Sequence, residues 1–221
     1  MNSVGTDTNT TRHRGLRQAV IGCALSACAL PTIAFTVTIP TGSRTLYLQV
    51  GVGSFTGTLQ GGGSPGANTT VNTVSVTVPA AQVGTGAAQA MTTNSTAANS
   101  FWDNFTFCSP PAQLYVGGFY RRNNTQGGAG ATLTATVPAT LSNGSGGTIP
   151  FSQISWTSSG ISDTGAQPFP AGTFVAGSTQ SIGTIARNQW AESCLTFSYA
   201  NAAVVRAGTY TGTVVYTLSA P

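Results

Sequence analysis

The chain has 221 residues, of which only 5% are charged, and a formal net charge of +4. So little charge would suit a membrane protein, but beyond the N-terminal region no apolar run reaches the ~18 residues of a membrane-spanning helix. A nucleic-acid-binding face is not indicated, because the arginines are not clustered along one predicted element and lysine is absent. The hydrophobic fraction of 40% is sufficient for a core and argues against wholesale disorder.

Residues 1–34 predict a secretory signal peptide. Three arginines between positions 12 and 17 form a positive segment, and residues 19–30 form a short apolar one. Pro31 argues against a continuous helix, and residues 31–34 form the region that precedes the expected cleavage site. We expect cleavage after Ala34, with Ala29 as the second choice.

A lipoprotein signal is the main alternative for the same region. Leu25–Cys28 resembles the lipobox of bacterial lipoproteins, in which Cys28 would be lipidated and become the first residue. An uncleaved anchor is a third option. The signal predicts export, to the bacterial periplasm, the cell surface or the medium. Contact with the membrane is expected only during export, unless Cys28 carries a lipid.

The first part of the exported chain alternates apolar and polar residues, the period of a β-strand with one buried face. Strands are predicted at 35–40, 45–55 and 69–79, with Val71, Val74, Val76 and Val78 as the apolar set of the third. Residues 80–100 are weakly patterned and are expected to be mostly loop, with a helical turn near 87–91.

The segment 101–111 holds the densest aromatic cluster, which we expect to lie in the core beside Cys108. Residues 114–122 and 131–141 predict two strands of a hairpin. Residues 149–158 follow as a strand with Phe151, Ile154 and Trp156 inward.

Towards the C-terminus, residues 168–183 predict two short edge strands, because proline and glycine interrupt them. Residues 190–199 predict a strand with a bulge near Cys194, because Trp190, Cys194 and Phe197 cannot share one face of a regular strand. Residues 207–221 alternate again, with Tyr210, Val214, Tyr216 and Leu218 on the buried side.

These elements predict an all-β fold, an antiparallel β-sandwich of immunoglobulin-like or pilin-like type, with about nine or ten short strands and no long helix. Neither an internal repeat nor a linker divides the exported chain. Residues 35–221 are therefore expected to form a single domain.

Cys108 and Cys194 are the two cysteines outside the export signal. In an oxidising compartment such a pair is expected to form a disulfide. Two buried free thiols are the alternative.

Catalysis is not expected, because the exported chain contains no histidine and no lysine. Nucleophilic triads, histidine-based metal sites and cofactor motifs therefore lack their residues. A carboxylate pair for glycoside hydrolysis is formally open from Asp103, Asp163 and Glu192. Simpler interpretations are turn caps at the two aspartates and an ion pair between Glu192 and Arg187.

One surface segment has the chemistry of a ligand site. Tyr120, Arg121 and Arg122 place two arginines beside an aromatic ring at a predicted hairpin tip, which suits acidic sugars or carboxylates. The alternative is a solvated loop with an arginine packed on Tyr120.

The two ends of the exported chain resemble chaperone–usher pilus subunits, in which an AGxYxxxVxxT-like segment forms the last strand. The residues that match this pattern are Ala207, Gly208, Tyr210, Val214 and Thr217. The resemblance implies an N-terminal strand donated to a neighbouring subunit, here through Phe35, Val37 and Ile39. It also implies partners, namely identical or related subunits or a periplasmic chaperone.

The function expected from this resemblance is that of a secreted, non-enzymatic, structural or adhesive surface protein. The rival hypothesis is a monomeric carbohydrate-binding β-sandwich module that recognises surface glycans.

Overall fold

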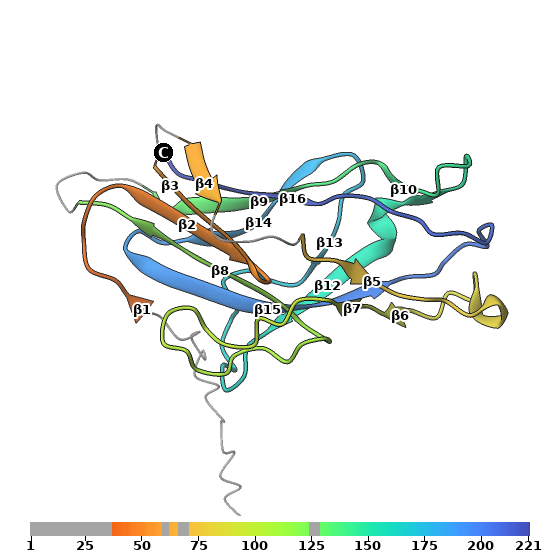
Figure 1. Ribbon diagram of the computed structural model, residues 1–221, viewed down its shortest axis with the longest axis horizontal. Coiled ribbons are helices and arrows are strands. Elements are labelled where there is room, and N and C mark those ends of the chain that lie inside the picture. The colour runs from red at the N-terminus through yellow and green to blue at the C-terminus, as the bar shows by residue number, and fades with distance from the viewer. Residues whose placement is uncertain (1–36, 59–61, 66–70, 124–128) are drawn as a thin grey trace, which may run out of the picture. The chain divides into compact units, whose positions relative to one another are not determined.

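Two antiparallel sheets packed face to face carry the fold, which the computed structural model describes for residues 37–58, 62–65, 71–123 and 129–221. Figure 1 shows the three strands of the smaller sheet together above β15 in the view. The strands of the larger sheet are, in spatial order, β13 (Gly172–Thr173), β12 (Ile154–Ser159), β15 (Gln189–Tyr199), β8 (Leu114–Arg121), β2 (Thr45–Val50), β3 (Gly53–Thr58) and β4 (Gly62–Pro65). Two short strands, β1 (Val37–Thr38) and β6 (Gln89–Ala90), also pair with β15.

The smaller sheet has three strands in the order β14 (Thr179–Ile185), β9 (Ala131–Thr136) and β16 (Val215–Ser219). The remaining elements are the strand pairs β5 (Val74–Ser75) with β7 (Thr92–Thr93) and β10 (Thr140–Ser142) with β11 (Thr148–Pro150), and the 3₁₀ turns η1 (Ala80–Gln82) and η2 (Phe151–Gln153). The prediction of an all-β sandwich without a long helix is confirmed. The strands outnumber the predicted nine or ten because several consist of only two paired residues.

The inner core lies between the two sheets and follows from the alternation of the strands. Each strand turns every second side chain inward, so aliphatic and aromatic residues from both sheets meet. Phe151, Ile154 and Trp156 are buried there, as predicted. Phe174 packs against Phe151 and Trp156, with ring centroids 5.3 and 4.7 Å apart.

Strand β15 contributes to both faces of the larger sheet. Trp190 and Cys194 point to the outer face, whereas Phe197 points into the inner core. The pairing of β15 with β8 and β12 runs in continuous register, so the bulge predicted near Cys194 is absent. The prediction was wrong because it assumed that all three residues belong to one core.

The predicted hairpin of residues 114–122 and 131–141 is also wrong. Strand β8 pairs with β2 and β15, whereas β9 lies in the smaller sheet between β14 and β16. Both segments have an apolar face, and both faces enter the same core from opposite sides. Alternation alone does not distinguish partners within a sheet from partners across a sandwich.

The C-terminal strand is shorter than predicted but faces as predicted. Strand β16 pairs with β9 alone, and Tyr216 and Leu218 pack on the inner core. Residues 207–214 approach the sheet irregularly, with a single bridge between Thr211 and Ser142. Val214 and Tyr210 nevertheless pack on the core from this segment.

Other local predictions had mixed outcomes. Strands β13 and β14 each lie at the edge of a sheet, as predicted for residues 168–183. Val74, Val76 and Val78 pack on the core, but Val71 is exposed. The helical turn is η1 rather than 87–91, because the latter region contains β6, which extends the hydrogen bonding of β15.

Within the ranges that the structure describes, no helix has the length and apolar character needed to cross a membrane. The predicted signal peptide lies outside the described residues and stays a prediction.

Candidate functional site

A ladder of aromatic side chains crosses the outer face of the larger sheet. Tyr47 on β2 is in register with Phe119 on β8, and Phe119 is in register with Trp190 on β15. The rings of Tyr47 and Phe119 stack with centroids 5.6 Å apart, and Trp190 lies 6.1 Å from Phe119. Such cross-strand pairs stabilise the sheet beyond the area that they bury. The ladder is the floor of the candidate site.

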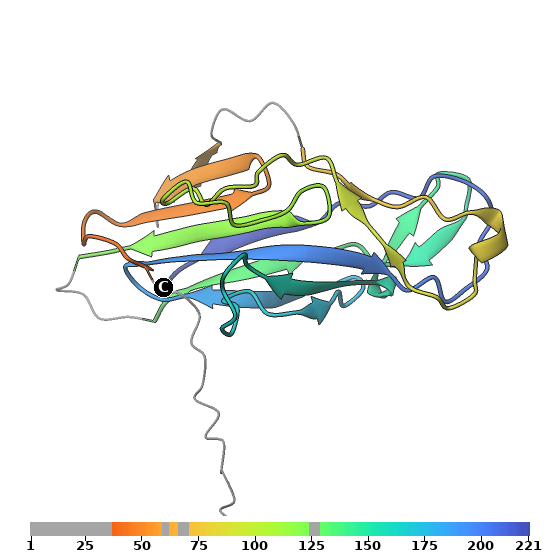
Figure 2. The same ribbon diagram turned by 90° about the horizontal axis from the view of Figure 1, so that it is seen from below.

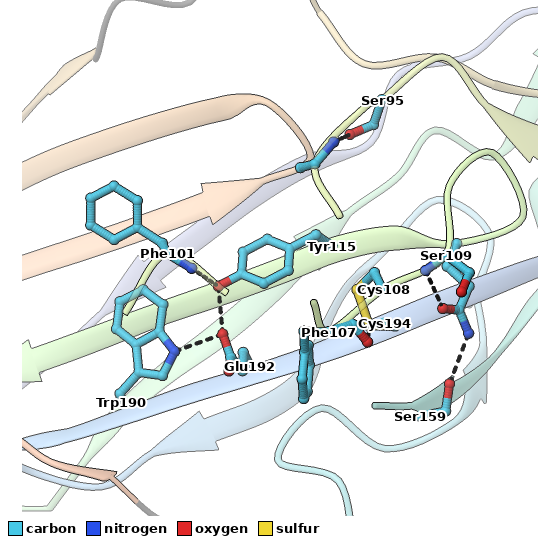
Figure 3. The surroundings of a disulfide bond; sticks show 12 residues. Ser95, Phe101, Phe107, Cys108, Ser109, Tyr115, Ser159, Trp190, Glu192 and Cys194 are labelled. Atoms are coloured by element: carbon cyan, nitrogen blue, oxygen red, sulfur yellow. Dashed lines mark hydrogen bonds between the residues drawn. A yellow bond between two sulfur atoms is a disulfide. The ribbon is translucent and has the colours of Figure 1, made fainter. Parts of the chain in front are cut away.

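Beside this ladder, Glu192 accepts two hydrogen bonds. Its Oε2 lies 2.7 Å from the Tyr115 hydroxyl and 2.8 Å from Trp190 Nε1 (Figure 3). Burial, and secondarily the negative charge of Glu192, raise the pKa of Tyr115 above its ordinary value. The phenol therefore stays protonated and acts as a donor to the carboxylate.

Gly117 makes room for this arrangement. It lies between Gln49 and Glu192 in the same row of the sheet, and a Cβ at this position would collide with the Tyr115 hydroxyl. A side chain here would displace the phenol from Glu192.

A loop between β7 and β8 covers the ladder. Residues 98–108 of this loop, which we call the aromatic hairpin, are attached to β15 by the disulfide between Cys108 and Cys194, whose Cα atoms are 5.5 Å apart. The yellow-green loop overlies β2 and β8 in Figure 2. The predicted disulfide is confirmed. Its role is to fix a loop on the sheet rather than to join the two sheets.

Ring contacts complete the attachment of the aromatic hairpin. Phe101 stacks on Tyr47 with centroids 4.8 Å apart and planes inclined by 22°. The backbone N–H of Phe101 also donates to the Tyr115 hydroxyl at 3.4 Å. Phe107 is buried and meets Tyr115 edge-on at 6.5 Å.

Hydrogen bonds within the hairpin fix its tip. The N–H of Ser100 donates to the Phe105 carbonyl at 2.8 Å, and the N–H of Asn104 donates to the Ser100 carbonyl at 3.0 Å. Asp103 Oδ1 accepts the N–H of Phe105 at 2.9 Å, which is an Asx turn. Asn104 adopts a left-handed conformation with φ of 61°, a region that asparagine tolerates well. The tip therefore has a defined shape.

The tip exposes three aromatic side chains to solvent. Phe101 is 59% exposed, Phe105 is 55% exposed and Trp102 is 44% exposed. The sequence predicted that the whole cluster lies in the core, and only Phe107 and Cys108 do so. Single exposed apolar side chains are common on protein surfaces, but neighbouring exposed aromatic side chains are unusual and often mark interaction sites. This surface is therefore a candidate binding site.

A hollow of about 510 Å³ adjoins Phe101. It lies between the hairpin and the end of β2, and its volume falls within the range common for small-ligand sites. The residues that line it are Gln49, Thr96, Ala97, Ala98, Asn99, Ser100, Phe101 and Asn104. None of these side chains is charged.

The structure divides the predicted arginine site between two faces, with Tyr120 and Arg122 on one and Arg121 on the other. Tyr120 is fully buried and Arg122 is 8% exposed, with Arg122 Nη1 3.1 Å from the Tyr120 hydroxyl. Arg121 points to the other face, where its guanidinium lies 6.0 Å from the Phe119 ring and donates to Thr45 Oγ1 at 3.4 Å. The alternation along β8 thus leaves only Arg121 accessible.

The predicted donated strand lies within its own domain in this structure. Val37 of β1 is in register with Trp190 of β15. Ile39 is buried in a hydrophobic cluster on the outer face of the larger sheet, which we call the outer cluster and which consists of Ile39, Tyr47, Phe107, Cys108, Tyr115, Trp190 and Cys194. The N–H of Ile39 donates to the Asn188 carbonyl at 2.9 Å. Phe35 lies outside the described residues. Donation of this segment to another subunit stays a prediction.

The three carboxylates within residues 35–221 have structural partners. Asp103 and Asp163 each accept a backbone N–H in a turn, as predicted. Glu192 bonds to Tyr115 and Trp190, partners that the sequence did not suggest. Among the described residues, no three histidine, cysteine or acidic side chains gather in a group able to hold a metal ion.

Comparison with known proteins gives no matching family model, no similar curated protein and no similar solved structure. The candidate site therefore rests on its own geometry. The sequence contained one signal for it: Asp103 and Asn104 interrupt the run of aromatic residues, and such turn-forming residues place their neighbours at a surface loop.

Proposed function

We propose that this chain is an exported, non-enzymatic, structural or adhesive protein of a bacterial surface, assembled by strand exchange in the manner of fimbrial subunits. The observation that carries this proposal is the weak attachment of the N-terminal strand. Within the described residues, which begin at Val37, strand β1 pairs with β15 at two positions, Val37 with Trp190 and Thr38 with Gln189, and Ile39 adds one backbone hydrogen bond to Asn188. An element held by so few pairs can exchange with the identical element of a second copy at low cost.

The side chains of this segment support the same proposal. Ile39 is 5% exposed and packs in the hydrophobic cluster on the outer face of the larger sheet. When the segment with β1 and Ile39 leaves, that cluster and the edge of β15 at Gln189 and Trp190 lose their cover. A neighbouring subunit would restore both, and before assembly a periplasmic chaperone would protect them.

Size-exclusion chromatography of the mature protein with and without residues 35–44 tests this function. Strand exchange predicts oligomers for the intact chain and loss of these oligomers after truncation. A monomer in both samples contradicts assembly by this strand.

Export is supported by the disulfide, which is compatible with an oxidising compartment outside the cytoplasm. Mass spectrometry of the protein recovered from cells distinguishes the two signals predicted for the N-terminus. A mature chain that begins at residue 35 supports the signal peptide 1–34, and a lipid-modified Cys28 supports the lipoprotein alternative.

A monomeric carbohydrate-binding module is the second candidate function. Its support is the rigid hairpin that exposes Phe101, Trp102 and Phe105 beside an uncharged hollow. Glycan-array binding by a protein that is monomeric in solution supports this function over assembly. Absence of binding to every glycan contradicts it.

A further inference from the structure

The Phe101 ring has the geometry of a stacking platform. One face of the ring rests on Tyr47 and is held parallel to Trp190, with planes inclined by 26° and centroids 5.9 Å apart. Because the ring is nonetheless 59% exposed, its other face is open to solvent. One face of the Phe101 ring is thus fixed against Tyr47, and the opposite face is accessible to a ligand.

The hollow beside the platform offers hydrogen-bonding groups. In the part of the chain that the structure describes, no hydrogen bond occupies the Thr96 hydroxyl or the side-chain nitrogen of Asn104. Both residues are exposed and line the hollow. A ligand that stacks on Phe101 therefore has a donor amide and a hydroxyl within the same site.

The composition of the site defines the ligand chemistry. A flat apolar ring next to uncharged amides and hydroxyls matches a molecule with one apolar face and a hydroxyl-rich edge, which is the character of a sugar ring. The lining contains no charged side chain, so it has no complement for a phosphate, a uronate or an acidic peptide. A hydrocarbon chain would leave the polar groups of the hollow unsatisfied.

The hairpin is also preorganised for binding. The disulfide, the stacking on Tyr47 and the hydrogen bonds between Ser100 and Phe105 fix the platform before a ligand arrives. A site that is ordered in advance does not lose affinity to loop ordering on binding.

We propose that Phe101 and the adjoining hollow bind a neutral glycan, with one sugar ring stacked on Phe101 and its hydroxyls bonded to Thr96 and Asn104. Trp102 flanks the platform and contacts the neighbouring sugar of the chain. This inference rests on the second of the proposed functions, carbohydrate binding, and assigns that function to a defined place on the outer face of the larger sheet.

Isothermal titration calorimetry with the mature protein tests the assignment. The probes are neutral oligosaccharides of hexoses and of N-acetylhexosamines, with oligomers of uronic acids as the acidic comparison. We expect a neutral series to bind and the uronate series to bind more weakly or not at all. Binding confined to the uronates overturns the proposal.

Substitutions then locate the site. Phe101→Ala should weaken binding by at least about tenfold, as truncation of an aromatic anchor does. Phe55→Ala removes a phenylalanine of similar exposure, 49%, from β3 outside the site, and should leave the affinity unchanged. Circular dichroism melting of each variant shows that it is folded before its affinity is compared.

Fluorescence gives an independent readout. Trp156 and Trp190 are buried, whereas Trp102 is 44% exposed, so quenching by iodide reports mainly on Trp102. Saturating glycan should protect the wild-type protein from quenching. In Trp102→Phe the protection should disappear while the affinity falls less than in Phe101→Ala.

The results distinguish failure of the proposed location from failure of carbohydrate binding itself. A folded Phe101→Ala protein that binds glycans like the wild type overturns the location and leaves carbohydrate binding in place. A wild-type protein that binds no glycan overturns both the location and that function. Self-association that Phe101→Ala abolishes, without any glycan binding, overturns the proposal in favour of contact between copies.

Discussion

The two faces of β15 support different kinds of structure. Its inner face joins a core of aliphatic and aromatic side chains, most of which come from strands. Its outer face carries Trp190, Glu192 and Cys194, which are stabilised by hydrogen bonds, ring stacking and a covalent bond to a loop. The inner core depends on non-directional apolar burial, and the outer cluster depends on specific partners in defined positions.

This contrast implies a difference in tolerance to substitution. Burial in the inner core is shared among many residues, and conservative apolar changes there are partly absorbed by repacking. In the outer cluster the polar groups bond to specific partners, such as Glu192 with Tyr115 and Trp190, so loss of one group leaves a hydrogen bond of its partner unmade. The following experiments test that difference, from the largest expected effect to the smallest.

Deleting residues 207–221 should prevent folding. The deletion removes β16, exposes one edge of β9 and uncovers the inner core beside Tyr216 and Leu218. The loss of several buried side chains, each contributing about 1.5–3 kcal/mol, is comparable with the total stability of a domain, about 5–15 kcal/mol. Thermal melting monitored by circular dichroism should show no cooperative transition. A truncated protein that is soluble and melts cooperatively would show that the inner core does not need this strand.

Two point substitutions refine the same experiment. Tyr216→Asp should behave like the deletion, because it places a carboxylate against the core. Thr213→Asp lies on an exposed position of the same segment and should change stability by less than about 0.5 kcal/mol. Equal effects of the two would contradict the inward orientation of Tyr216.

Removing the disulfide should destabilise the protein by about 2–5 kcal/mol while leaving the sandwich able to fold. The variant Cys108→Ser/Cys194→Ser, unfolded in urea and compared with the wild type, gives this value. The protein should carry no alkylated thiol before a reductant is added. Loss of all cooperative folding in the serine variant would show that the inner core depends on the outer cluster.

Tyr115→Phe should cost about 1.5–3 kcal/mol, because it removes a hydrogen bond to the charged Glu192 from a fully buried site. Tyr210→Phe is the matched control. The Tyr210 hydroxyl donates to the Arg206 carbonyl at 2.9 Å in an exposed setting, so its loss should cost less. Urea unfolding of both variants measures the difference, and equal costs would show that the Glu192 contact is not a specific support of the outer cluster.

Alkaline pH should moderately lower the free energy of unfolding, through one buried tyrosine in the inner core and one in the outer cluster. Burial raises the pKa of Tyr216 in the inner core, and burial with the Glu192 charge raises that of Tyr115 in the outer cluster. Above the ordinary tyrosine pKa of about 10, the unfolded chain releases protons that the folded chain retains. Stability is therefore fully present below this pH and falls as the pH rises above it. Melting temperatures that do not fall between pH 9 and pH 11 would contradict the burial of these hydroxyls.

The inner core was largely predictable from the sequence, and the outer cluster was not. Alternation identified Ile154, Trp156, Tyr216 and Leu218 as inward-facing because burial follows the two-residue period of a strand. It did not identify the partners of β8 and β9, since both sheets of a sandwich produce the same pattern.

The candidate site depends on contacts that no local pattern encodes. Phe101 was expected to be buried because it lies in an aromatic run, yet its position is set by Tyr47 and by a disulfide to Cys194, 86 positions from Cys108. Trp190 and Cys194 were predictable as buried, but the existence of a second apolar cluster on the outer face was not. Its cover is an irregular loop, for which hydrophobic periodicity gives no signal.

The disulfide also changes how the chain would respond to mechanical tension. If the chain is pulled at its two ends, strands outside the segment from Cys108 to Cys194 can be extended, including β1, β2 and β16. The segment between the two cysteines spans 86 positions and cannot lengthen while the covalent bond is intact. The disulfide therefore reduces the length to which the whole chain can be extended by roughly 300 Å. Strands β8, β9, β12 and β14 lie within that closed loop, so under load they remain joined at the point where the aromatic hairpin is attached.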